Sequence, residues 1–344
     1  VLVQLYNLYT NLRRGSTQHR LVIDKAGMGT VADASRYTRT QVQLGLQAIE
    51  NGFAARLENT KIYTPDGMDI YTPTGVGKLI MPLGNRNSSQ SLDGLCRFSR
   101  VPLHEGAHKI IRLFVYWDSP ADIDLSLMLY DAKGEPLGGV WYGDQQVDDY
   151  AYHSGDVTDG TGGAWEFIDL NIAEALAQKV RYAIPTVHLY AGYGGTHVHG
   201  PQECPCQKLY RQERTLADVN DLFVGFTMVP RAGAGKDVHE VSQVRTKFML
   251  TSAGRGSLPL IFDLRERTVT VTDVGLRGYI NIVESARTVQ AMLETFRHHR
   301  PMTVADYLAL TWANVVETPD EADICLEPTV ASLSQLYLQN TSPQ

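Results

Sequence analysis

The sequence lacks the features by which several large classes of protein are recognised. It has 4 cysteines in 344 residues, and two of them are separated by a single residue, which is not the pattern of a disulfide-stapled secreted domain. Its longest largely apolar stretches, such as Ile110–Trp117, fall far short of the roughly 20 residues that a membrane-spanning helix needs. No signal-peptide pattern opens the chain. We therefore expect a cytoplasmic protein without a membrane span, and peripheral attachment to a membrane stays open.

Positive charge is also scarce. The chain carries 38 acidic and 31 basic side chains, a formal net charge of -7, and its basic residues form no run longer than two. A phosphate-binding stripe is therefore absent from the sequence, and nucleic acid is not expected as a partner. At 43% hydrophobic residues the chain can bury a large core without a structural metal. A metal, if bound, would then serve function.

Catalytic signatures are missing as well. The chain has no nucleophile elbow, no phosphate-binding P-loop, no zinc-protease helix motif and no dinucleotide fingerprint. Residues 233–236 imitate a phosphate loop but lack the Ser or Thr that should follow the lysine. His153, Ser154 and Asp156 are suggestive of a hydrolase, but neighbours in sequence do not by themselves place a nucleophile against its base. The sequence favours a noncatalytic protein.

What the sequence does have is a succession of short β-prone segments between Leu95 and Val274, separated by turn residues. No long helices alternate with them, so the pattern predicts a mainly β protein built as a two-sheet sandwich. The predicted strands are Ile110–Trp117, Leu125–Tyr130, Gly139–Tyr142, Ala164–Leu170, Tyr182–Tyr190, Leu222–Val229, Thr246–Thr251, Leu258–Asp263 and Thr268–Thr272.

The flanks have a different pattern. A helix is predicted over Thr38–Arg56, followed by hairpins and turns over residues 61–84. In the tail, a helix is predicted over Ile282–His298, and a second is expected to begin at Thr303 as its N-cap. The expected domains are an α/β N-terminal segment at 1–92, the β-sandwich at 93–276, and a helical tail with a disordered end at 277–344.

The first candidate site lies where one predicted strand runs into a loop and back into another. Asp122 and Asp124 are two residues apart, so in an extended segment their side chains share a face. Two carboxylates held this close repel each other unless a cation or protons lie between them, and hard oxygen ligands suit Ca2+. The alternative is a solvated acidic turn.

The second candidate is the glycine-rich loop at residues 153–163, which leads into Glu166. Its glycines allow the backbone to turn its carbonyl groups inward, while Asp156 and Asp159 supply charge. Such a loop is typical of a cation site, and equally of a simple corner.

The third candidate combines two imidazoles and two thiols within ten residues. His197, His199, Cys204 and Cys206 are the donor types of a tetrahedral Zn2+ site. Zinc modules usually draw their ligand pairs from separate elements, so a polar insertion without metal is the alternative.

Taken together, the D-x-D-L-S segment at 122–126, the H-S-G-D-x-T-D-G segment at 153–160 and the I-D-L segment at 168–170 resemble the TerD family of tellurium-resistance and stress proteins. The resemblance runs from about Leu95 to Gly275 and implies a β-sandwich that binds Ca2+ at these loops. It implies that Asp122, Asp124 and Asp156 form the core of the site.

The chain departs from the family where the second loop should continue with further acidic residues. It has Val157 and the uncharged run 160–165 instead, which leaves only Asp159 and Glu166 as additional ligands. Because ligand charge sets affinity at oxygen sites, this departure predicts a weakened, single-ion or lost site.

The sequence therefore predicts a noncatalytic scaffold that binds a divalent cation, Ca2+ before others, in a bacterial stress response. Its expected partners are other stress-response proteins. The alternative is a binder of phosphorylated metabolites, or an enzyme, in which a metal and the basic segment Arg97–Arg100 hold a phosphate.

Overall fold

The computed structural model divides the chain into two compact units. The sandwich unit comprises residues 21–32 and 87–293, and the second unit comprises residues 1–20, 33–86 and 294–344. The structure describes residues 19–24, 27–33, 38–58, 69–72, 76, 100–103, 109–190, 215–229, 244–276, 289–296, 303–305, 308 and 314–325. Within these ranges, no helix combines the length and apolar character needed to cross a membrane.

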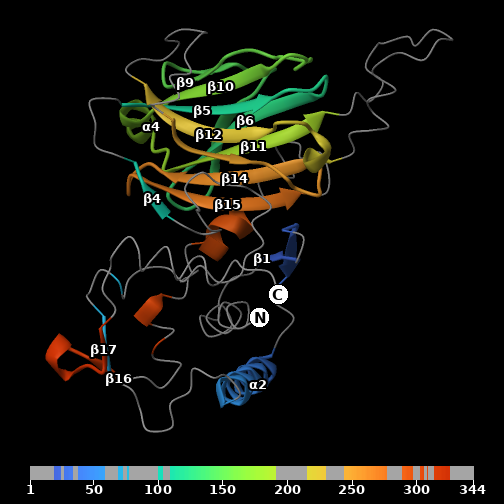
Figure 1. Cartoon of the computed structure of the whole chain (residues 1–344). Coiled ribbons are helices and arrows are strands. Elements are labelled where there is room, and N and C mark those ends of the chain that lie inside the picture. The colour runs from blue at the N-terminus through green and yellow to red at the C-terminus, as the bar shows by residue number, and fades with distance from the viewer. Residues whose placement is uncertain are drawn as a thin grey trace. The chain divides into compact units, whose positions relative to one another are not determined.

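Two six-stranded sheets form the sandwich unit (Figure 1). The strands of the first sheet are β5 (Ile110–Trp117), β8 (Gln146–Val147), β9 (Ala151–His153), β10 (Ala164–Asn171), β12 (Phe223–Val229) and β13 (Val244–Met249). Those of the second are β4 (Arg100–Pro102), β6 (Asp122–Tyr130), β7 (Pro136–Val140), β11 (Tyr182–Tyr190), β14 (Gly256–Asp263) and β15 (Thr268–Leu276). The strand orders are β13-β12-β5-β10-β9-β8 and β4-β15-β14-β11-β6-β7. Every pair within these two sheets is antiparallel.

Alternate residues of the strands fill the core between the sheets. In β6 the odd-numbered residues from Ile123 to Leu129 belong to this core, so Asp122 and Asp124 lie on the opposite face of the strand. In β10 the apolar even-numbered residues belong to it, which places Glu166 on the inward face. Burying an apolar side chain in this core stabilises the fold by about 1.5–3 kcal/mol.

Shorter elements complete the sandwich unit. The helix α4 (Ile172–Ala177) begins where the Asn171 side chain accepts hydrogen bonds from two backbone N–H groups, and a short 3-10 helix, η2, spans Leu216–Asp218. The strands β1 (His19–Ile23) and β2 (Gly29–Asp33) pair with each other, and the residue before β2, Met28, forms a parallel bridge with Gly275 at the end of β15.

The second unit contains α2 (Arg39–Glu58) and a three-stranded parallel sheet of β16 (Asn314–Val316), β3 (Asp69–Tyr71) and β17 (Ile324–Cys325). A 3-10 helix, η4, spans Pro319–Glu321. Thr38 caps α2 reciprocally: its Oγ1 accepts from the Gln41 N–H at 3.3 Å, and the Gln41 side chain accepts from the Thr38 N–H at 2.9 Å.

The mainly β two-sheet sandwich predicted from the sequence is confirmed, as is the helix starting after Thr38. One strand was predicted too far along: β7 ends at Val140 because Trp141 and Asp144 close a tight turn through two backbone hydrogen bonds of 3.0 Å. The prediction of hairpins over 61–84 is wrong for β3, whose partners are β16 and β17.

The tail is only partly helical. Residues 289–296 are helical, within the predicted segment, but residues 314–325 contribute two strands to a sheet, which the sequence analysis did not predict. The predicted disordered end at residues 326–344 lies outside the described residues.

Candidate metal centre

Asp122 and Asp124 are the first and third residues of β6. The preceding loop is fixed by two hydrogen bonds: the Trp117 indole donates to the Ala121 carbonyl at 2.8 Å, and the Ala121 N–H donates to the Ser119 hydroxyl at 3.2 Å. Each residue of β6 also pairs with a residue of the neighbouring strand β11. The two carboxylates are therefore carried by rigid backbone.

Asp156 reaches the same place from the loop between β9 and β10. Gly155, immediately before it, has a φ of 110°, a conformation that glycine adopts without strain. Farther along this loop, the Gly162 N–H donates to the Asp118 carboxylate at 2.9 Å, which ties the loop to the one before β6.

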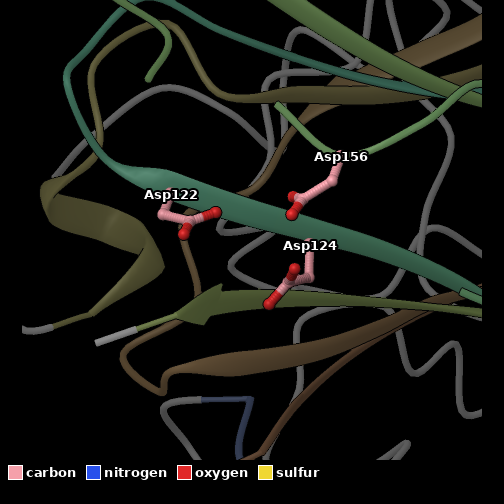
Figure 2. A group of neighbouring side chains, drawn as sticks. All are labelled: Asp122, Asp124 and Asp156. Carbon is pink, nitrogen blue, oxygen red and sulfur yellow. The ribbon is translucent and has the colours of Figure 1, made fainter. Parts of the chain in front are cut away.

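The three aspartates converge. Each offers a carboxylate oxygen, and these atoms all lie within 4.8 Å of one another. Figure 2 shows Asp122 and Asp124 on the strand and Asp156 opposite them, with the three carboxylates turned toward a common space. Asp124 is buried, Asp122 is half-buried and Asp156 is exposed, so the group is open to solvent on the side of the loop.

Two oxygens of this group are buried without compensation. Within the described part of the chain, Asp122 Oδ1 and Asp124 Oδ2 have no hydrogen-bond partner. A buried, unsatisfied carboxylate oxygen is costly, and native proteins rarely leave one without an ion, a water or a proton.

Burial and repulsion between the acidic groups also raise the pKa values of Asp122 and Asp124. Burial, followed by repulsion from Asp156 and Glu166, raises the pKa of Asp122 from 3.8 to about 7. Burial, followed by repulsion from Asp122, Glu166 and Asp156, raises the pKa of Asp124 from 3.8 to about 8. Near neutral pH these carboxylates therefore keep protons unless a cation replaces them.

The neighbouring histidine does not supply that charge. His188 on β11 is the cross-strand neighbour of Asp124, and it is buried. Burial lowers the pKa of its imidazole from 6.5 to about 4, so His188 is neutral at neutral pH. Positive charge for the carboxylates has to come from outside this strand pair.

Glu166 is close to the three aspartates but is bonded differently. It is fully buried in the sandwich, and its two oxygens accept the N–H groups of Leu125 and Val157, each at 2.9 Å. Its side chain lies inside the sandwich because β10 turns residue 166 inward.

Asp159, a further predicted ligand, does not belong to this group. Asp159 is exposed, and its carboxylate accepts the Thr161 N–H at 2.9 Å, a contact that lowers its pKa. The zinc candidates His197, His199, Cys204 and Cys206 lie outside the described residues, as does Arg97 of the predicted phosphate-binding segment.

A hydrolase arrangement of His153, Ser154 and Asp156 is not formed. The Ser154 hydroxyl accepts the Phe167 N–H at 2.9 Å, and both ring nitrogens of His153 are within hydrogen-bonding distance of backbone groups. The sequence analysis missed the buried role of His153. Its position opposite Ile168, a core residue, is a consequence of strand pairing that the sequence does not reveal.

The donor set defines which ions fit. Three carboxylates and no described nitrogen or sulfur donor form a hard oxygen site, which suits Ca2+ or Mg2+ rather than soft transition metals. An acidic triad of this kind can hold a metal ion.

Comparison with known proteins gives a distant structural likeness. No protein-family model matches the chain, and no curated protein matches it. A solved homologue of the telluride resistance protein (TerD) from Streptomyces coelicolor A3(2) is 14% identical, with a TM-score of 0.37, over 52% of this chain and 95% of that chain. A solved protein of unknown function is 16% identical, with a TM-score of 0.34, over 49% of this chain and 93% of that chain.

The first of these structures bears the name of the family that the sequence motifs resemble.

Proposed function

We propose that this protein binds a divalent cation, Ca2+ before Mg2+, between Asp122, Asp124 and Asp156, and that binding is its task rather than catalysis. The supporting observation is the pair of buried oxygens, Asp122 Oδ1 and Asp124 Oδ2, that have no hydrogen-bond partner in the described structure. A bound cation would satisfy both and remove the repulsion between them.

The preference for Ca2+ follows from the different backbone elements that carry the three carboxylates. Two carboxylates are on a paired strand and the third is on a loop, so the geometry is asymmetric. Ca2+ accepts 6 to 8 oxygens in irregular arrangements, whereas Mg2+ requires a near-ideal octahedron. Backbone carbonyls and water would complete the shell.

Isothermal titration calorimetry with Ca2+, Mg2+ and Zn2+ tests the proposal. We expect a Ca2+ heat in the wild type that is lost in Asp122→Asn/Asp124→Asn, while Asp159→Asn, an exposed change in the same loop, keeps it. No Ca2+ heat in the wild type, or an equal heat in the double variant, would overturn the assignment. A Zn2+ heat abolished by Cys204→Ser/Cys206→Ser would instead support zinc at residues 197–206.

The wider role is proposed from the motif resemblance. We infer that ion binding orders the loop that carries Asp156 and thereby a surface for protein partners in a bacterial tellurite or chemical stress response. Cells producing the wild-type chain should then survive tellurite better than cells producing Asp122→Asn/Asp124→Asn at equal protein level. Equal survival would separate the ion site from this role.

A further inference from the structure

Glu166 connects the two parts of the metal centre through their backbones. Its Oε2 accepts the N–H of Leu125, the residue directly after Asp124, and its Oε1 accepts the N–H of Val157, the residue directly after Asp156. One carboxylate thus fixes the peptide that follows a ligand on the strand and the peptide that follows a ligand on the loop. Both hydrogen bonds are 2.9 Å long.

His153 makes the same connection from the neighbouring strand. Its Nε2 lies 2.9 Å from the Leu125 carbonyl, and its Nδ1 accepts the N–H of Gly155 at 3.0 Å. Because Nδ1 accepts a hydrogen bond, Nε2 is the ring nitrogen that donates to the Leu125 carbonyl. The residues on both sides of Asp156, Gly155 and Val157, are therefore tied to a single residue of β6.

This connection occupies an edge of β6 that no strand covers. The partner β7 pairs with β6 only from Leu127 onward, so the described structure has no strand beside Leu125 on that side. Glu166 and His153 take the place of the missing strand: one accepts the N–H of Leu125 and the other donates to its carbonyl. Both side chains are fully buried, which keeps water from competing.

We propose that Glu166, with His153, is a positioning residue of the metal centre: it sets the separation between Asp124 and Asp156 and does not itself bind the ion. This role rests on the proposed cation binding. It differs from a ligand role because both Glu166 oxygens already accept backbone N–H groups, and the converging group comprises the three aspartates without Glu166.

Two substitutions of Glu166 separate the effect of side-chain length from the effect of charge. Glu166→Asp keeps the negative charge but is one methylene shorter, so it cannot accept both N–H groups. Glu166→Gln keeps the length but has one acceptor oxygen, and its NH2 group would face an N–H. Loss of partners that orient a metal ligand typically lowers affinity by about 10–100-fold, so we expect a loss of at least about tenfold in Ca2+ affinity for both variants.

The coordination shell supplies the readout that distinguishes positioning from binding. Luminescence lifetimes of bound Eu3+ in H2O and D2O count the waters on the ion. We expect that count to be unchanged in Glu166→Asp and to rise in Asp156→Ala, which removes the ligand oxygen. Amide hydrogen exchange of the metal-free protein adds a second readout, because Gly155 and Val157 should exchange faster in Glu166→Asp than in the wild type.

The outcomes separate the two proposals. No binding of Ca2+ or Eu3+ by the wild type overturns the cation site and this role with it. Binding by the wild type with unchanged affinity in Glu166→Asp overturns the positioning role alone, as does a rise in bound water, which would make Glu166 a ligand. If the Glu166 variants do not fold, His153→Gln serves instead, since its amide NH2 replaces Nε2 as the donor to Leu125 while no acceptor atom takes the position of Nδ1 beside Gly155. Unchanged affinity there would also overturn the role.

Discussion

Two pairs of neighbouring side chains in the sandwich differ in their charges: in one, two fully buried residues carry opposite charges, and in the other, both residues are carboxylates, one buried and one half-buried. Arg112 on β5 and Asp169 on β10 are joined by two hydrogen bonds of 2.7 and 2.8 Å, and the guanidinium lies 4.1 Å from the centre of the Phe167 ring. Asp122 and Asp124 have like charges, and one oxygen of each has no hydrogen-bond partner in the described structure.

The difference shows which of these charged groups have a counter-charge within the protein. The Arg112–Asp169 pair carries its own counter-charge, so it needs nothing from solution. The Asp122–Asp124 pair is stable only with protons or with a cation, because its own strand neighbours supply no positive charge at neutral pH. The first pair belongs to the stability of the fold, and the second is available for binding.

The largest effect is expected from removing half of the complete pair. Asp169→Ala leaves a buried guanidinium without its carboxylate, so we expect the free energy of unfolding to fall by about 3–5 kcal/mol in chemical denaturation. Replacing both residues, Arg112→Met with Asp169→Leu, should cost less than the single change. A loss of no more than about 1 kcal/mol in Asp169→Ala, the value typical of an exposed ion pair, would contradict the distinction.

An intermediate effect is expected from adding Ca2+, which supplies the counter-charge of the Asp122–Asp124 pair. Because a ligand that binds only the folded state stabilises it, Ca2+ at a hundred times its dissociation constant should raise the free energy of unfolding by about 2.7 kcal/mol. Thermal unfolding with excess Ca2+ and with a chelator measures this difference. Asp122→Asn/Asp124→Asn is the control and should show no Ca2+ stabilisation. Equal stabilisation of that variant would point to a different binding site.

The smallest effect is the pH dependence of the metal-free protein. The folded-state pKa values of about 7 for Asp122 and about 8 for Asp124 exceed the ordinary 3.8, so the folded state holds protons that the unfolded chain has lost. The resulting stability is fully present below about pH 4 and is lost as the pH rises through 7 and 8. After allowance for solvent access, the loss between about pH 5.5 and about pH 8.5 is on the order of 1–2 kcal/mol.

Thermal unfolding in chelator at several pH values measures this loss, and it should be much reduced in Asp122→Asn/Asp124→Asn. With Ca2+ present the trend should reverse, because the ion competes with protons and gains affinity as they leave. Stability that increases with pH in the metal-free wild type would contradict the raised pKa values.

The sequence was sufficient for the strands with strong patterns and for the pair at the start of β6. Residues 122–127 alternate, with hydrophobic residues at the odd positions, so the shared face of Asp122 and Asp124 follows from strand geometry alone. The glycine-rich loop made Asp156 a candidate, but its place beside the pair could be proposed only from the motif resemblance, because its distance to the pair depends on how two loops meet in space.

The rest depends on contacts between segments far apart in the sequence. The strand β3 has no signal of its own partners, since β16 and β17 follow it by more than two hundred residues. The strands β8 and β9 are too short for any pattern to predict. Glu166 shares its even numbering with the core residues of β10, so the alternation of the strand could have revealed its inward position. Its hydrogen bonds with the N–H groups of Leu125 and Val157 form only when β6 and the loop are in place.

The uncovered edge of β6 has a consequence for association between molecules. An open strand edge is a template on which a second chain can add a strand, and this is a route to aggregation. At Leu125 the groups that would recruit such a strand are already used by Glu166 and His153. The two side chains that hold the loop beside the aspartates therefore also keep this edge closed to other copies of the protein.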